Sequence, residues 1–176
     1  MIQQIKSTLP NFPDEVIETW LLPFAVSEGW PPVIGSDGVP LKRWRYLLGR
    51  KPLSEFKTLS WSKVTKHISI HEFDRESLSS LIQIFEAAIL GCDNLMSLSI
   101  HDLKQRFDNI VNYIQQNGKM PNAPILYLND MKKYEIFDGN HHLSAYYYCC
   151  GYFNVDVESN LKLKTQKNQI YWIASH

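Results

Sequence analysis

The feature that most constrains the fold is a pair of short apolar segments with a helical segment directly after them. APILYL (123–128) and YEIFD (134–138) are rich in β-branched and aromatic residues, and the polar stretch NDMKK between them is typical of a turn. The two segments therefore predict a β-hairpin. GNHHLSAYYYCCG (139–151) follows without a linker and predicts a helix that ends at Gly151. Such a chain must pack strands and helices around one core.

Apolar spacing predicts two longer helices before this hairpin. One covers residues 74–91, with Asp74 in the N-cap region and Gly91 as the stop, and the other covers 99–118, with Ser99 as the cap candidate. The apolar stripes are Leu78, Leu81, Ile82, Phe85 and Ile89 in the first helix, and Leu103, Phe107, Ile110, Val111 and Ile114 in the second.

Three other short segments predict strands. They are KHISI (66–70), YFNVDVE (152–158) and, as one more candidate, QIYWIA (169–174). The order β-α-α-β-β-α-β belongs to the α+β class. We therefore expect a small mixed sheet with packed helices.

Residues 1–60 differ in amino-acid composition from the rest of the chain. They contain seven of the nine prolines and three of the five tryptophans. Short helices are predicted within 13–25, bounded by Pro23, and within 41–52, ended by Gly49 and Pro52, with a loop between them. Tryptophans among prolines are typical of a compact cap with large rings as anchors. We expect residues 1–60 to form a cap packed on a main domain of residues 61–176; the alternative is a separate recognition module.

Composition narrows the class of protein. Hydrophobic residues make up 44%, while 18 Lys and Arg balance 18 Asp and Glu, so the chain lacks the global basic field of most nucleic-acid-binding proteins. A local basic patch would have to come from the structure. No run approaches the length of a membrane span and the N-terminus lacks a signal-peptide core, so a cytoplasmic chain is expected. Adjacent Cys149 and Cys150 are expected to be reduced thiols.

The start of the helix at 139–151 has the chemistry of an anion site. A helix N-terminus exposes unpaired N–H groups and the positive end of the helix dipole. Gly139 allows a phosphate to approach the backbone, and the imidazoles of His141 and His142 can donate hydrogen bonds and gain a proton near neutral pH. In the alternative interpretation, Asp138 caps the helix and the histidines are surface residues.

Other chemistries find less support. A metal site could be formed by His101, His141 and His142 with Asp138. Adjacent histidines on a helix, however, point about 100° apart and rarely ligate one ion together. No metal site is expected. The chain also lacks the phosphate-loop, nucleophile-elbow and zinc-protease motifs.

The segment PILYLNDMKKYEIFDGNHHLSAYYYCCGY resembles the C-terminal half of the ParB/sulfiredoxin fold, in which a strand pair runs into D-G-H-H-R-L-x-A and a helix. Asp138, Gly139, His141, Leu143 and Ala145 match this form in place. KHISIHEFDRESL is similar to the opening element of the same fold. The resemblance covers roughly residues 66–158 and leaves residues 1–60 outside. It implies a domain of the ParB-like nuclease or free-serine-kinase type.

The resemblance also implies a ligand and the residues that hold it. The ligand would be ATP or another nucleotide with Mg²⁺, or a phosphorylated small molecule. Its phosphates would be held by Asp138, Gly139, Asn140, His141 and His142.

The catalytic residues that the resemblance implies lie mostly near the opening strand. Glu72 and Asp74, with His71 beside them, would supply a general base or an Mg²⁺ ligand, and His141 would join them from the helix start. The alternative is that both acids are solvent-facing loop or helix-cap residues.

Two positions depart from the family pattern. Asn140 occupies the position of the catalytic cysteine of sulfiredoxins, so repair of sulfinic acids is not expected. His142 occupies the position of an arginine that grips phosphate through two hydrogen bonds, whereas an imidazole makes one such contact. Because a neutral imidazole binds phosphate poorly, anion affinity should fall above about pH 7.

Two functions follow as hypotheses. The first is a nucleotide-dependent phosphotransferase or NTPase. The second is a non-catalytic ParB-like module that binds a protein partner through residues 1–60, or DNA. The neutral net charge favours a protein over a nucleic acid.

Overall fold

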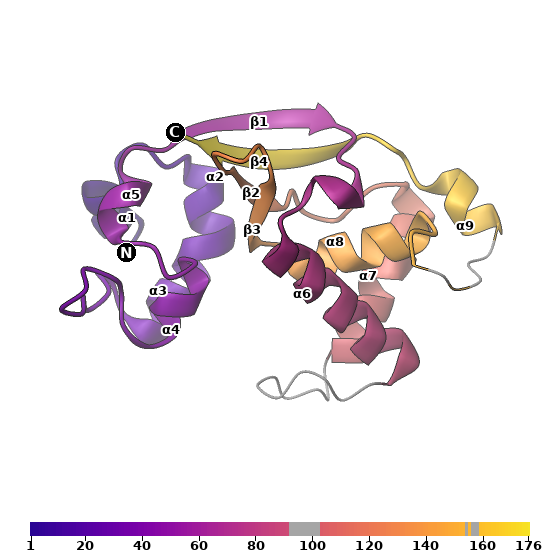
Figure 1. Cartoon of the computed structure of the whole chain (residues 1–176), viewed down its shortest axis with the longest axis horizontal. Helices are drawn as coiled ribbons and strands as arrows, with labels where there is room; N and C mark the ends of the chain where they lie inside the picture. The colour runs from indigo at the N-terminus through magenta and orange to yellow at the C-terminus, as the bar shows by residue number, and fades with distance from the viewer. Residues whose placement is uncertain (92–102, 154, 156–158) are drawn as a thin grey trace. The chain divides into compact units, whose positions relative to one another are not determined.

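The computed structural model describes residues 1–91, 103–153, 155 and 159–176. The chain divides into two compact units, one of Met1–Ser62 with Trp172–His176 and the other of Lys63–Tyr171 (Figure 1). The division after residue 62 lies two residues beyond the boundary expected at residue 60, and the last five residues join the N-terminal unit.

Short helices make up most of the N-terminal unit. The helix expected over 13–25 forms, but the prediction that Pro23 bounds it is wrong. In the π-helical segment η1 the N–H of Leu22 donates to the carbonyl of Ile17, and Pro23 follows in the first turn of α3, where a missing N–H is tolerated. The helices are α1 (Ile2–Thr8), α2 (Asp14–Val16), η1 (Ile17–Leu21), α3 (Leu22–Glu28), α4 (Lys42–Leu47) and α5 (Leu53–Phe56).

Aromatic rings form the core of this unit. Trp20 is fully buried, and the ring of Phe12 lies 4.6 Å from that of Trp61 and 6.4 Å from that of Trp20. The rings of Trp30 and Trp44 pack edge to face at 5.2 Å. These contacts hold irregular chain in place, which is the role expected of tryptophans among prolines.

A four-stranded sheet runs in the order β1-β4-β2-β3. The strands are β1 (Ser60–Lys66), β2 (Ile125–Leu128), β3 (Tyr134–Asp138) and β4 (Gln169–Ser175). β2 and β3 pair antiparallel, with Leu126 opposite Ile136, so the predicted hairpin is confirmed. The last strand is also confirmed, and a mixed sheet with packed helices agrees with the α+β class.

Two predicted strands do not form as expected. The strand at 66–70 is wrong because Ser69 and Glu72 form a capping box that starts the 3₁₀ helix η2 (Ile70–Glu72). Of the strand expected at 152–158, Tyr152, Phe153 and Val155 are described and lie outside any strand. The remaining four residues, like Cys92, Ser99 and His101, lie outside the described residues.

Three predicted helices of the Lys63–Tyr171 unit are confirmed, although Ile82 of the predicted apolar stripe in the first is exposed. They are α6 (Arg75–Phe85), continued by the π-helical segment η3 (Glu86–Leu90), α7 (Leu103–Asn117) and α8 (Asn140–Cys149). A further short helix, α9 (Ser159–Lys164), was not predicted.

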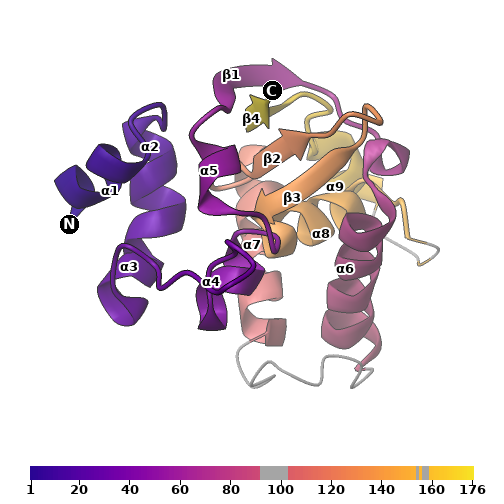
Figure 2. The same cartoon turned by 60° about the vertical axis from the view of Figure 1, so that its left-hand side comes forward.

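α8 lies between α6 and α7 on one face of the β2–β3 hairpin (Figure 2). The Ser144 hydroxyl donates to the carbonyl of Leu81 on α6 at 2.8 Å, and the ring of Tyr148 lies 5.7 Å from that of Phe107 on α7. Tyr146 and Tyr147 are fully buried, so α8 is a core helix. The core thus fixes where the start of α8 lies.

Candidate functional site

The candidate site is the start of α8, directly after β3. Asp138 ends β3, and Gly139 is the N-cap of α8 with a φ of 96°, a left-handed conformation that glycine adopts at little cost. A Cβ atom on Gly139 would lie 2.9 Å from the Cβ of Pro124. The turn and the packing of Pro124 both require glycine here, and Pro124 occupies the space beside Gly139 that the sequence led us to expect a phosphate to use.

The first turn of α8 is open to a hydrogen-bond acceptor. No side chain among the described residues caps it, so the alternative in which Asp138 caps α8 is wrong. The carbonyl of Gly139 accepts from the N–H of Leu143 at 2.9 Å, in the first bond of the helical ladder. The N–H groups of Asn140, His141 and His142 precede that bond and point toward the positive end of the helix dipole.

The Asp138 carboxyl is largely buried beside these N–H groups. Burial raises its pKa from 3.8 to about 6, against the opposing effect of a hydrogen bond from the backbone of Gly139. The group therefore exchanges its proton close to neutral pH, which few carboxyl groups do. A carboxyl with such a pKa at a helix start is a candidate for binding or proton transfer.

The two imidazoles are partly buried and their pKa values lie below the ordinary value. Burial is the main cause for both, followed for His141 by the positive charge of Arg106 and for His142 by the charge of His141. Without a bound anion both rings are therefore neutral at pH 7. The sequence-based expectation of protonation near neutral pH does not hold for the free protein.

Arg106 is a residue that sequence reasoning missed. It lies on α7, and its guanidinium is close enough to His141 to lower the pKa of that imidazole. A guanidinium thus adds a positive charge near His141 from a neighbouring helix. The proximity of Arg106 to His141 could not be predicted from local sequence, because it depends on the packing of α7 against α8.

Glu72 and Asp74 stabilise other helix starts. Glu72 Oε2 accepts from the N–H of Ser69 at 2.6 Å in the capping box of η2, and Asp74 Oδ1 accepts from the N–H of Ser77 at 2.9 Å at the start of α6. His71 is exposed, and its carbonyl accepts from Lys133 Nζ. Asp74 is therefore a helix-cap residue, as in the alternative interpretation of the sequence.

The structure also separates these acids from the start of α8. The N–H of Asp74 donates to the carbonyl of Tyr134 at 3.0 Å, at the first residue of β3, whereas Asp138 is its last residue. The length of β3 places the two backbones roughly 13 Å apart along the strand. Asp138, Asn140, His141 and His142 therefore lie together where β3 ends and α8 begins, and Glu72 and Asp74 lie at the other end of the strand.

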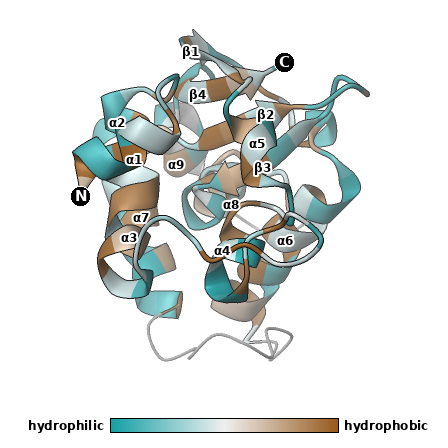
Figure 3. Ribbon diagram, turned by 90° about the vertical axis from the view of Figure 1, so that its left-hand side faces the viewer, coloured by the Kyte–Doolittle hydropathy of each residue, from teal (hydrophilic) through white to brown (hydrophobic). Residues whose placement is uncertain are grey.

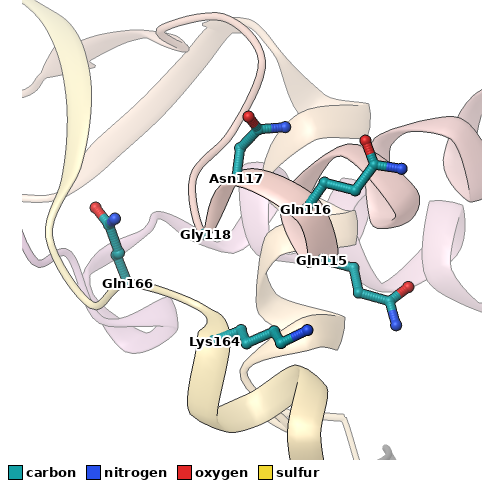
Figure 4. Close-up of a pocket in the computed structure, with 6 residues that line it drawn as sticks. All are labelled: Gln115, Gln116, Asn117, Gly118, Lys164 and Gln166. Atoms are coloured by element: carbon teal, nitrogen blue, oxygen red, sulfur yellow. The ribbon is translucent and has the colours of Figure 1, made fainter.

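A polar cleft of about 620 Å³ lies at the far end of α7 (Figure 4). Its lining residues are Gln115, Gln116, Asn117, Gly118, Lys164 and Gln166. Side-chain amides can donate and accept hydrogen bonds, but this lining contains one cation and no carboxyl, thiol or imidazole group. It is the weaker candidate for phosphate chemistry.

The described residues bear on three other chemistries. They contain no group of three or more His, Cys, Asp or Glu side chains placed to hold a metal ion. Burial raises the pKa of Cys149 to about 12 and that of Cys150 to about 11, so both thiols stay protonated and react slowly at pH 7. None of the helices in the described part of the chain has the length and apolar character needed to cross a bilayer.

Comparisons with known proteins give no relative from which a function could be inferred. No protein-family model matches it, and no curated protein and no solved structure matches it. Function then has to follow from the geometry of the site. That geometry offers backbone donors, two neutral imidazoles, one titrating carboxyl and a nearby guanidinium, a set suited to holding an oxyanion.

Proposed function

We propose that the Lys63–Tyr171 unit binds the phosphate of a nucleotide at the start of α8. The observation that carries this proposal is the uncapped helix start, whose first turn contains His141 and His142. A phosphate offers enough acceptor oxygens to satisfy several of these donors at once. The resemblance of the same residues to the D-G-H-H motif of ParB/sulfiredoxin-like proteins supports the assignment.

Binding at this site is coupled to proton uptake. A bound dianion raises the pKa of every nearby titratable group, so His141 and His142 gain protons and Asp138 loses its charge more easily. Arg106 adds a positive charge that does not titrate. Phosphate affinity therefore increases as the pH falls through the pKa values that the two imidazoles have in the complex, and it levels off below their pKa values in the free protein.

Asp138 is the group best suited to move a proton in phosphate chemistry. With a pKa of about 6 it can accept a proton from an attacking hydroxyl or water at neutral pH, which makes it the candidate base of an NTPase or phosphotransferase. Glu72 and Asp74 hold the starts of η2 and α6 instead.

Calorimetric titration with ATP, CTP, GTP and inorganic phosphate, each with Mg²⁺, tests the binding step. We expect one nucleotide to bind with micromolar affinity and His141→Ala/His142→Ala to weaken that binding at least about tenfold, the loss of one or more charge-assisted hydrogen bonds. His71→Ala removes an exposed imidazole near the other end of β3 and serves as the matched control. Equal affinity in the double variant and in the control would refute the proposal.

A non-catalytic binding module is the second candidate function, favoured by the capping roles of Glu72 and Asp74. Asp138→Asn separates the two functions because the amide keeps the shape and removes the proton acceptor. If the protein is a binding module, Asp138→Asn retains or increases nucleotide affinity, and neither the wild-type protein nor the variant releases phosphate. In an enzyme it retains affinity and loses turnover, measured as phosphate release under saturating nucleotide.

A further inference from the structure

We propose that the N-terminal unit binds single-stranded nucleic acid through a basic surface on α4 and the loop after it. We name it the α4 surface. Its residues are Lys42, Arg43, Arg45, Tyr46, Arg50 and Lys51.

The neutral charge of the whole chain conceals this surface. Residues 38–54 contain five basic residues and no acidic residue, whereas four acidic residues of the same unit lie between positions 14 and 28. Positive charge therefore predominates on the α4 surface, where Glu28 lies 3.7 Å from Arg43 and Asp37 lies 2.9 Å from Arg45. A local field of one sign attracts a polyanion whatever the net charge, and the release of its counterions drives binding. In Figure 3 α4 is drawn largely in the teal of hydrophilic residues.

Two buried residues hold α4 rigidly. Trp44 is 3% exposed, its indole N–H donates to the carbonyl of Gly29 at 3.1 Å, and Leu48 is fully buried one turn later. Because residues four apart lie on the same face of a helix, this inward face directs the neighbouring basic side chains outward. Lys42 and Arg43 are exposed.

An exposed ring distinguishes this surface from a simple cluster of charges. Tyr46 is 70% exposed, and the guanidinium of Arg50 lies 5.9 Å from the centre of its ring. Proteins that bind single strands stack bases on such rings and on arginine planes. A base paired inside a duplex cannot stack in this way, and an acidic peptide has no base. Tyr46 therefore favours single-stranded nucleic acid over both.

Neighbouring groups orient two of the arginines. Arg45 pairs with Asp37 at 2.9 Å, and Arg43 lies 3.7 Å from Glu28 with its guanidinium 4.9 Å from the ring centre of Phe24. A guanidinium has five N–H donors and can bind a phosphate while keeping such a contact. The surface thus presents oriented phosphate ligands around one stacking ring.

Fluorescence anisotropy on the full chain tests the proposal, with labelled deoxythymidine and uridine strands of about 20 nucleotides and a duplex of equal length. We expect the single strands to bind more tightly than the duplex, and affinity to fall between about 50 and 200 mM salt. Arg50→Ala/Lys51→Ala should reduce the slope of log affinity against log salt by roughly 1.4, about 0.7 for each phosphate contact.

Tyr46→Ala tests stacking separately from charge. It should weaken binding roughly 5- to 100-fold without changing the salt slope, and Tyr46→Phe should retain affinity. Because Tyr46 is exposed, these variants should unfold at the wild-type temperature, which circular dichroism checks. The matched control is Lys162→Ala/Lys164→Ala, which removes two exposed charges from α9 in the other unit and should leave strand binding unchanged.

Three results would overturn the proposal. They are no single-strand binding at about 50 mM salt, equal affinity for polyglutamate of the same length, and an unchanged affinity in Tyr46→Ala. The outcome is independent of the phosphate site, because His141→Ala/His142→Ala should leave strand binding intact while it weakens nucleotide binding.

Discussion

Two helix starts in the Lys63–Tyr171 unit lie beside opposite ends of β3 and are built in opposite ways. α6 begins at Asp74, whose carboxylate accepts from the N–H of Ser77 at 2.9 Å, so one of its exposed backbone donors is satisfied within the protein. α8 begins at Gly139, which has no side chain, and no described side chain takes the capping position.

The difference separates a structural helix start from one that can receive a ligand. A capped start contributes about 1 kcal/mol of stability, whereas an uncapped start with a largely buried carboxyl beside it contributes nothing of that kind. The uncapped start of α8 therefore leaves backbone N–H groups that a hydrogen-bond acceptor from outside the protein can use. Substitutions at four positions near β3 test this contrast.

Gly139→Ala should have the largest effect on stability. The left-handed φ of 96° disfavours alanine by about 1–2 kcal/mol, and the new Cβ would lie 2.9 Å from Pro124, so we expect a loss of roughly 3 kcal/mol or more in the free energy of unfolding. Urea denaturation measures it. Gly38→Ala, at a φ of 77° with open space around it, is the control and should lose only the conformational part. Equal losses would show that Pro124 does not confine the turn.

Asp138→Asn should stabilise the protein above pH 6. Between about pH 4 and 6 the folded state holds a proton on Asp138 that the unfolded state has released, so the free energy of unfolding falls as the pH rises through that window. The charge costs up to roughly 3 kcal/mol at neutral pH, which asparagine avoids. Urea denaturation at a series of pH values should show a gain in the variant near pH 7 and none near pH 4. A variant less stable than wild type at pH 7 would mean that the carboxylate is well solvated.

Asp74→Ala should act in the opposite direction by a smaller amount. It removes the cap of α6 and should lower the free energy of unfolding by about 1 kcal/mol at pH 7, because the N–H of Ser77 loses its acceptor. Thermal and urea denaturation report the loss. Asp74→Asn keeps an acceptor oxygen and should recover most of it. Loss of nucleotide affinity in Asp74→Ala without any change in stability would assign this acid to the site.

Glu72→Gln should have the smallest effect. A glutamine at this position still accepts from the N–H of Ser69 in the capping box, so stability should change by less than about 0.5 kcal/mol. Nucleotide affinity and any turnover should be unchanged within error. If phosphate release disappears in this variant, then Glu72 is the base and the role proposed for Asp138 is wrong.

Local sequence signals predicted the elements that position the site. The β2–β3 hairpin and α8 follow from short apolar segments, a polar turn and a terminal glycine, all of which act within a few residues. The strand expected at 66–70 was wrong for an equally local reason. The Ser69–Glu72 capping box outweighs the β propensity of two isoleucines.

The electrostatics of the site could not be predicted in this way. The raised pKa of Asp138 depends on burial, and the influence of Arg106 on His141 depends on how α7 packs near the start of α8. Net charge likewise concealed the α4 surface, because cancellation over the whole chain says nothing about separation within a unit. Sequence patterns identified the residues of the helix start, whereas tertiary packing determines their charge.

The measurement that tests the central claim most directly is an amide chemical-shift titration of the ¹⁵N-labelled protein with ATP and Mg²⁺. Both helix starts report in one spectrum. The account predicts large, saturable shifts at the amides of Asn140, His141 and His142, and small shifts at Arg75, Glu76 and Ser77, because the cap on α6 already holds the N–H of Ser77. Shifts centred on the start of α6, or none at either start, would contradict it.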